Sequence, residues 1–435
     1  MAFAISGEEN SAHTTSCHCP FLHSDAKASI NSRSSSSGVL GSLWNITQMS
    51  VGIGMLSFPY GFQRDGFGIA TVTLCVVGLL SISSVYMLAS SQKHAREVFA
   101  TERVSYMEVV HAVLGDGWQQ VAAACMFLAN AGTCIAYEIF ICNTFATYFP
   151  ELSFIGWLLV LQCPLVVCCA FRSLRWLSVV SFIGLVCLWL GIGMSMWLMI
   201  ENAAEKSWAS QELVTDLEGF SLFIGLSALS FEGLAVAALT VEQSMKSPEY
   251  FMPVVIVAIV FILVLECSFA LLGCFSFGSE TDQVITKSFP NCYIATMASI
   301  AFSLELLFTF PGAMYPVWKY WEVRLFGPRP ADLQSPTPFR LSLALSKEDS
   351  LSSRSSRRLA SRVCALTLFR SVGVFAMAGV AWTCRDIFAE FVSLIGSFTC
   401  SAVVFLIPAR LHLELVESYS LSWFLAVILL MVAIV

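Results

Sequence analysis

The stretch MSVGIGMLSFPYGFQRDG, residues 49–66, decides how this chain folds. It lies in the first long apolar segment, yet it contains Gly52, Gly54, Pro59 and Gly61, residue types that weaken or break a helix. Small residues also let membrane helices pack closely, so a packing role is the simplest alternative to a break. Whether these residues break the helix or let it pack closely depends on whether the segment spans a membrane and whether the chain has a second such stretch.

The composition places the chain in a lipid bilayer. Of its 435 residues, 57% are hydrophobic and 12% are charged, whereas charged residues make up about 25% of soluble domains. A spanning helix needs about 20 largely apolar residues. Eleven stretches satisfy this: 38–62, 66–88, 121–149, 154–171, 177–200, 219–240, 252–277, 293–318, 363–383, 388–411 and 418–435. We therefore predict an all-α integral membrane protein with 11 transmembrane helices.

The basic residues support this count, because Lys and Arg in short loops stay on the cytoplasmic side. With the N-terminus cytoplasmic, 18 of the 23 Lys and Arg residues lie inside, four lie outside, and Arg370 is within a span. A missed helix would invert every later loop and scramble this asymmetry. Residues 1–37 are polar and Ser-rich, and we expect a disordered cytoplasmic tail there. The stretch 319–361 is expected to be a flexible cytoplasmic loop.

A second interrupted span lies at 219–240, where Ser227, Ser230, Glu232 and Gly233 fall mid-span. It is the sixth span, five positions after the first, and an odd offset inverts one relative to the other. Paired broken helices in two inverted halves are typical of secondary transporters. A break exposes N–H groups and a positive helix end, which hold an anion such as a substrate carboxylate.

Four motifs carry a resemblance to a known family over residues 38–413. They are GIGMLSFPYGFQRDG, FEGLAVAALTVEQSMKSPEYF, FTFPGAMYPVWKYWE and FVSLIGSFTCSAVVFLIPARLHL, and their order and spacing resemble the amino acid/auxin permease family. The stretch NAGTCIAYEIFICNTF, residues 130–145, is most similar to the vacuolar and aromatic or neutral amino acid branch. The resemblance implies a LeuT-like fold of two inverted five-helix repeats, 38–200 and 201–411, with helices 1 and 6 broken and a last helix at 412–435.

The resemblance also implies amino acid transport by alternating access and a set of substrate-binding residues. The first break would bind the substrate carboxylate and amino group through backbone atoms, and neutral or aromatic side chains would suit the pocket walls. The expected substrate site comprises Val51, Gly52, Ile53, Gly54, Met55, Tyr137, Ser230, Phe231, Glu232, Gly233 and Thr309.

The coupling ion is expected to be a proton. Sodium-coupled family members place an Asn near the position of Gln48, so sodium is less favoured here. Ionisable residues at membrane depth are functional candidates by default, and those of this chain are Glu138, Glu232, Glu266, Glu305 and Arg370. Glu232 is favoured as the proton carrier because it lies on the second break, with Glu138 next. The alternative is that these acids pair with Arg370 or with backbone groups and hold helices together.

Two functions from different classes fit these features. The first is a proton-coupled secondary transporter of neutral or aromatic amino acids, with sodium coupling or exchange as a variant. The second is an amino acid sensor of the same fold. The expected partners are an amino acid, a proton and the lipid bilayer, in a vacuolar or plasma membrane. No enzyme motif, cofactor or metal site is expected, and the net charge of −7 disfavours nucleic acid.

Overall fold

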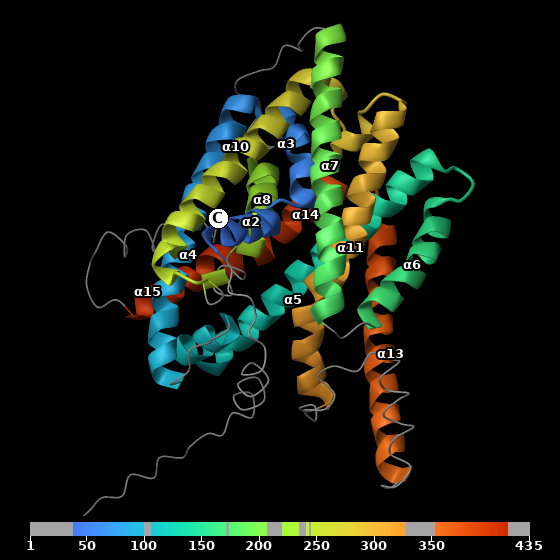
Figure 1. The fold of residues 1–435 in the computed structure, drawn as a ribbon. Coiled ribbons are helices and arrows are strands. Elements are labelled where there is room, and N and C mark those ends of the chain that lie inside the picture. Colours follow the sequence, from blue (N-terminus) through green and yellow to red (C-terminus); the bar gives the residue numbers. More distant parts are fainter. Residues whose placement is uncertain are drawn as a thin grey trace, which may run out of the picture.

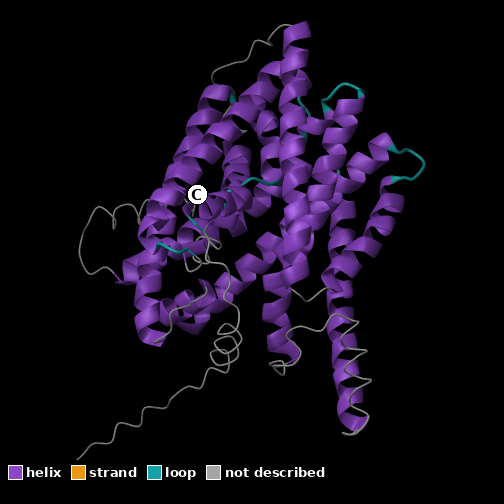
Figure 2. Cartoon of the chain, viewed as in Figure 1, coloured by secondary structure: helices purple, strands orange, loops and turns teal. Residues whose placement is uncertain are grey.

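The computed structural model describes residues 38–99, 106–170, 174–206, 220–234, 241–242, 245–326 and 353–415. Every regular element in these ranges is helical (Figure 1, Figure 2). The first half contains α2 (Val39–Ser50), the 3₁₀ segment η1 (Ile53–Ser57), α3 (Phe58–Asp65), α4 (Phe67–Phe99), α5 (Tyr106–Tyr148), α6 (Phe154–Ala170) and α7 (Leu174–Lys206). The second half contains α8 (Phe220–Ser230), η2 (Pro248–Tyr250), α10 (Phe251–Phe277), η3 (Gly278–Glu280), η4 (Ile285–Lys287), α11 (Tyr293–Phe326), α13 (Ser353–Cys384), α14 (Phe388–Ile395), the π-helical segments η6 (Gly396–Cys400) and η7 (Ala402–Leu406), and α15 (Ile407–Leu415).

Helices occupy the first ten of the predicted spans. Among the described residues, seven helices are long and apolar enough to cross a membrane, and two shorter apolar helices cover Phe154–Cys169 and Phe220–Leu234. The eleventh stretch, 418–435, and the tail 1–37 lie outside the described residues, so the count of eleven stays a prediction. Helices α11 and α13 extend into both ends of the stretch 319–361, and its centre also lies outside the described residues.

The surface of α10 shows why these helices suit a bilayer. Val260 and Val264 are 51% and 62% exposed, whereas Ile259 and Ile262 are fully buried. A helix that is apolar on both its outer and inner faces is stable where the surrounding solvent is hydrocarbon. Glu266 lies on the buried face of α10.

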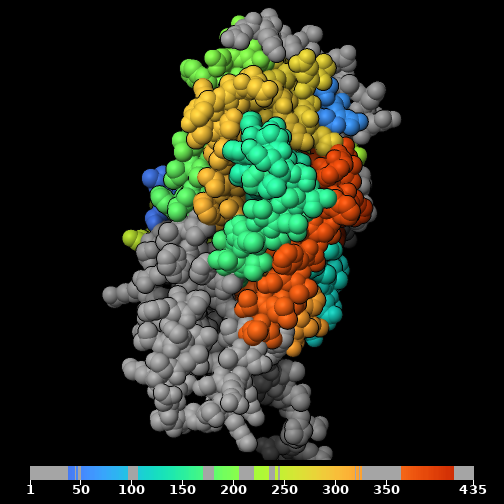
Figure 3. Space-filling model, turned by 90° about the vertical axis from the view of Figure 1, so that its right-hand side faces the viewer, coloured from blue at the N-terminus to red at the C-terminus, as the bar shows by residue number. Residues whose placement is uncertain are grey.

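The helices form a bundle around the broken first span. Both α2 and α3 pack on α10, while η1 packs on α8. On the other side of the bundle α7 runs along α11, and α6 packs against α5, α11 and α13 (Figure 1). The face in Figure 3 shows α6 at the surface, between α11 and α13. The two broken helices are therefore enclosed by α4, α5, α10 and α14.

The span 388–415 contains two widened turns that its sequence did not predict. The π-helical segments η6 and η7 interrupt it between α14 and α15. Such turns leave carbonyl groups without normal helical donors. Here the Tyr106 hydroxyl donates to the Val403 carbonyl at 2.9 Å, and the Ser84 hydroxyl donates to the Val404 carbonyl. Two side chains from α4 and α5 thus stabilise the irregular backbone.

Arg370 has a structural role. Its Nε donates to Glu322 Oε1 at 2.6 Å and its Nη1 donates to the Cys169 carbonyl at 2.6 Å, which links α13 to α11 and α6. The alternative in which Arg370 pairs with one of the four membrane-depth acids is therefore wrong, because its acidic partner is Glu322. Within the described part of the chain, no ion pair joins Arg370 to Glu138, Glu232, Glu266 or Glu305.

Candidate functional site

The first predicted break is present between α2 and α3. Helix α2 ends at Ser50, Val51 and Gly52 are extended, and the first backbone bond of the next segment runs from the Met55 N–H to the Gly52 carbonyl at 3.2 Å. The N–H groups of Ile53 and Gly54 precede that bond, and the first N–H groups of any helix have no partner within it. They give this end of η1 the partial positive charge of a helix N-terminus.

The two glycines of the break have different surroundings. A Cβ atom added to Gly54 would lie 3.5 Å from the Leu226 carbonyl oxygen, which is an ordinary contact distance, so η1 packs on α8 at this position without requiring a glycine. A Cβ atom added to Gly52 would meet nothing within 4 Å. Gly54 therefore lies at the contact of η1 with α8, while the Cβ position of the half-buried Gly52 is open.

The second break follows α8. That helix ends at Ser230, Phe231 forms a turn, and Glu232 and Gly233 begin a new helical turn in which the Leu234 N–H donates to the Phe231 carbonyl at 3.3 Å. The carbonyl end of α8 thus reaches the interior of the bundle. Carbonyl groups at such an end carry partial negative charge and attract cations.

The two breaks are in direct contact. Ser50 is the last residue of α2, and its carbonyl oxygen lies 3.2 Å from the Ser230 hydroxyl. The same hydroxyl also forms a hydrogen bond with Glu266 Oε1. One positive and two negative helix ends therefore lie close together around Gly52. A zwitterion with a carboxylate and an ammonium group matches this arrangement of partial charges.

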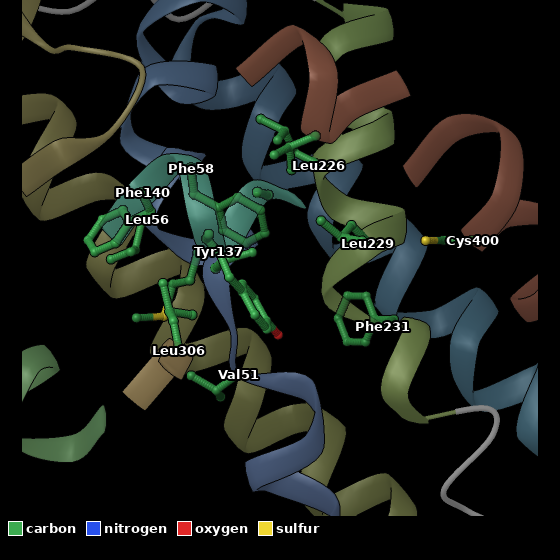
Figure 4. Packing of buried hydrophobic residues seen from close by; sticks show 14 of the residues in the cluster. Val51, Leu56, Phe58, Tyr137, Phe140, Leu226, Leu229, Phe231, Leu306 and Cys400 are labelled. Atoms are coloured by element: carbon green, nitrogen blue, oxygen red, sulfur yellow. The ribbon is translucent and has the colours of Figure 1, made fainter. Parts of the chain in front are cut away.

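Tyr137 of α5 faces the same space. Its ring is 6% exposed, and Figure 4 shows its hydroxyl directed between Val51 and Phe231. Its electrostatic neighbours are Glu305 and Glu232. Leu306 and Leu229 lie around the same region in Figure 4, so the walls are mainly apolar and aromatic.

Met55 and Thr309 were also predicted to belong to the substrate site. Met55 is buried in η1. The Thr309 hydroxyl donates to Glu305 Oε1 at 2.9 Å, one turn away on α11, so its hydrogen is used within its own helix.

The two favoured acids have separate environments. Glu232 is half-buried and interacts with the Cys400 thiol of η6. Glu138 is fully buried, and its Oε2 accepts a 3.1 Å bond from Gln162 of α6, while Oε1 has no partner among the described residues. Glu232 therefore belongs to the break, whereas Glu138 belongs to the contact between α5 and α6.

The contact of Ser230 with Glu266 was not predicted. Both residues were candidates from the sequence, Ser230 for the substrate site and Glu266 as an acid at membrane depth. The sequence of one apolar helix does not indicate which side chains of another helix it contacts. Their separation of 36 residues along the chain makes the pairing a property of the bundle.

Two broken helices that meet beside open space, within an all-helical protein of several membrane spans, are typical of membrane transporters. A search of family models agrees. The chain belongs to the family described as Transmembrane amino acid transporter protein, whose model matches residues 35–435. The resemblance inferred from the four motifs is confirmed.

Individual relatives are similar over most of this chain. It is 26% identical over 404 residues to amino acid transporter AVT3C of Arabidopsis thaliana, covering 87% of this chain and 83% of the relative. It is 23% identical over 391 residues to vacuolar amino acid transporter 4 of Saccharomyces cerevisiae, covering 84% and 51%. The vesicular inhibitory amino acid transporter of Xenopus tropicalis is 23% identical over 384 residues, covering 86% and 69%. All three are named as transporters rather than enzymes, in line with the prediction.

Proposed function

We propose that this protein is a secondary active transporter of amino acids that works by alternating access. The observation that carries the proposal is the meeting of two helix breaks beside the open space at Gly52. The N–H groups at the start of η1 would bind the substrate carboxylate, and the carbonyl ends of α2 and α8 would bind its ammonium group. The relatives named as amino acid transporters support the substrate class.

The walls of this space favour neutral or aromatic side chains. Val51, Phe231 and Leu306 offer apolar surface, and Tyr137 adds one hydroxyl (Figure 4). A charged substrate side chain would need a buried counter-ion, because an unpaired charge in such a site is costly. Thr309 and Glu305 already hydrogen bond to each other. We therefore expect leucine-like and tyrosine-like substrates to be carried better than basic ones.

The driving ion in this proposal is a proton. Glu232 is the first candidate because it is the acid of the second break, and Glu138 is the second because it is buried in the same helix as Tyr137. Sodium coupling and exchange are the alternatives to be separated by experiment, since the side chain of Gln48 lies outside those the structure describes.

The remaining parts of the proposal concern the whole chain. The fold is taken as two inverted five-helix repeats plus a last helix, with the N-terminus in the cytoplasm. The names of the yeast relatives favour a vacuolar membrane. No feature of the described residues favours the sensor function over transport.

Uptake into proteoliposomes tests the proposal. Purified protein is reconstituted and offered a panel of labelled amino acids with a pH gradient, a sodium gradient or neither. Uptake driven by the pH gradient supports proton-coupled transport, whereas binding without uptake under every gradient would move the assignment to a sensor. Glu232→Gln should lose the response to the pH gradient while exchange of internal for external amino acid persists. An unaltered response in that variant would remove Glu232 as the carrier.

A further inference from the structure

The contact between the two breaks depends on where hydrogen atoms are placed. The Ser230 hydroxyl has one hydrogen, and it lies within bonding distance of the Ser50 carbonyl oxygen and of Glu266 Oε1. The Ser50 carbonyl can only accept a hydrogen bond. When the Ser230 hydrogen points to it, the bond between Ser230 and Glu266 requires a hydrogen on Glu266. Both bonds coexist only with the protonated acid.

The ionised acid gives a different arrangement. A carboxylate can only accept, so it would take the Ser230 hydrogen and leave the Ser50 carbonyl without it. The bond that joins the end of α8 to the end of α2 would then be lost. No covalent change is needed, because a proton from water adds to Glu266 or leaves it.

The position of Glu266 suits such a role. Its side chain is fully buried on α10, and its second oxygen, Oε2, has no hydrogen-bond partner among the described residues. Burying a carboxylate with a single donor costs free energy. The two charge states of this acid therefore differ in how strongly they favour the packed arrangement of α10, α8 and α2.

Glu232, two residues after Ser230 on the second break, is the other acid near this contact, so the test below removes its titration. The titratable neighbour of Glu266 is the thiol of Cys267, which itself faces Cys75 of α4. No ion pair involving Glu266 occurs in the described part of the chain. The charged residues described on the elements packed against α10 lie near the ends of those elements: Arg64 and Asp65 on α3, Lys93, His94 and Arg96 on α4, Glu201 on α7, Glu249 on η2 and Glu280 on η3.

We propose that Glu266 is a positioning residue whose protonation, acting through the Ser230 hydroxyl, joins the two helix breaks and prepares the substrate site. The inference rests on the proposed function, since it assigns a pH-dependent step to the same site. The protonated protein holds α8 against α2 and binds amino acid tightly. The ionised protein releases this contact and binds it weakly. By linkage, bound amino acid raises the affinity of Glu266 for its proton.

Equilibrium binding to the purified full chain tests this inference. Binding of labelled L-leucine and L-tyrosine is measured at pH 5.5, 6.5 and 7.5 (about one pH unit per step), because one linked proton changes affinity by at most about tenfold per pH unit. Wild-type Kd should rise with pH over part of this range. In a Glu232→Gln background, which removes titration of the other acid at the breaks, adding Glu266→Gln should give the tight Kd at every pH, within about twofold, because the amide N–H donates to Ser230 as the acid does.

Two further variants keep the test decisive. In the same Glu232→Gln background, Ser230→Ala removes the hydroxyl without adding volume. This variant should bind weakly at every pH with no pH slope, which covers the case in which Glu266→Gln fails to fold. Glu249→Gln makes the same substitution at an exposed carboxyl just before α10 and should keep the wild-type slope. A wild-type slope in Glu266→Gln or Ser230→Ala would overturn the inference, as would wild-type binding that does not change with pH.

Failure of the proposed function gives a different result. If neither binding nor uptake of any amino acid in the panel occurs at any pH, the substrate class is wrong. If uptake occurs and Glu266→Gln keeps the wild-type pH slope of Kd, the transporter assignment stands and only the role of Glu266 falls.

Discussion

Replacing Gly52 with Ala should separate substrate binding from stability. The backbone at Gly52 is extended, with φ of −149° and ψ of −159°, so φ is negative, as L-residues prefer. The added methyl group meets no atom within 4 Å. The fold should therefore tolerate the change, and the loss of Gly flexibility in the unfolded chain should add at most about 1 kcal/mol to the free energy of unfolding.

The same methyl group should weaken substrate binding. It would occupy the open space beside the free N–H groups of η1, where the substrate backbone is proposed to lie. Overfilling a packed site costs about 1–3 kcal/mol, which corresponds to about a 5- to 140-fold rise in Kd. Because the methyl meets the part that all amino acids share, leucine and tyrosine should lose affinity to a similar degree.

The assay combines Kd with thermal stability in detergent, using Gly379→Ala as the matched control. Gly379 lies on α13, and a Cβ there also meets nothing within 4 Å. The control should gain about 0.8–1 kcal/mol of stability from better helix propensity and keep the wild-type Kd. An unchanged Kd in a folded Gly52→Ala protein would refute the placement of the substrate at this break.

Three further predictions follow from the packing. Arg370→Met should lower the free energy of unfolding by about 3–5 kcal/mol because it breaks the buried ion pair with Glu322, and the double change with Glu322→Met should recover most of the loss in a thermal unfolding assay. Gly396→Ala should lower the free energy of unfolding by at least about 1–3 kcal/mol, because its Cβ would overlap the Gly225 carbonyl oxygen of α8. Wild-type thermal stability of this variant would contradict the close contact of α8 with η6. Tyr137→Phe should leave stability within about 0.5 kcal/mol of wild type and raise Kd two- to tenfold, or about 0.5–1.5 kcal/mol, if the hydroxyl bonds substrate; an unchanged Kd would exclude that bond.

The positions of the helices and of both breaks could be predicted from the sequence because these are local properties. A run of about 20 apolar residues specifies a spanning helix without reference to the rest of the chain. Gly52 and Pro59 disfavour a continuous helix through their own backbone chemistry, and the structure has extended residues between α2 and η1. The family was also recognisable, because its motifs are continuous stretches.

The partners within the site could not be predicted, because they depend on which faces of the helices meet. Helix α10 carries Ile259 and Ile262 on its buried face and Val260 and Val264 on its exposed face, and these residue types are interchangeable to a sequence pattern. In a soluble protein polar residues would mark the outer face, but in lipid both faces are apolar. The sequence by itself determined a membrane protein of this family with two broken helices. Only the tertiary structure decided that Arg370 pairs with Glu322 and that Ser230 lies between Ser50 and Glu266, because contacts over 48, 180 and 36 residues arise when the helices pack.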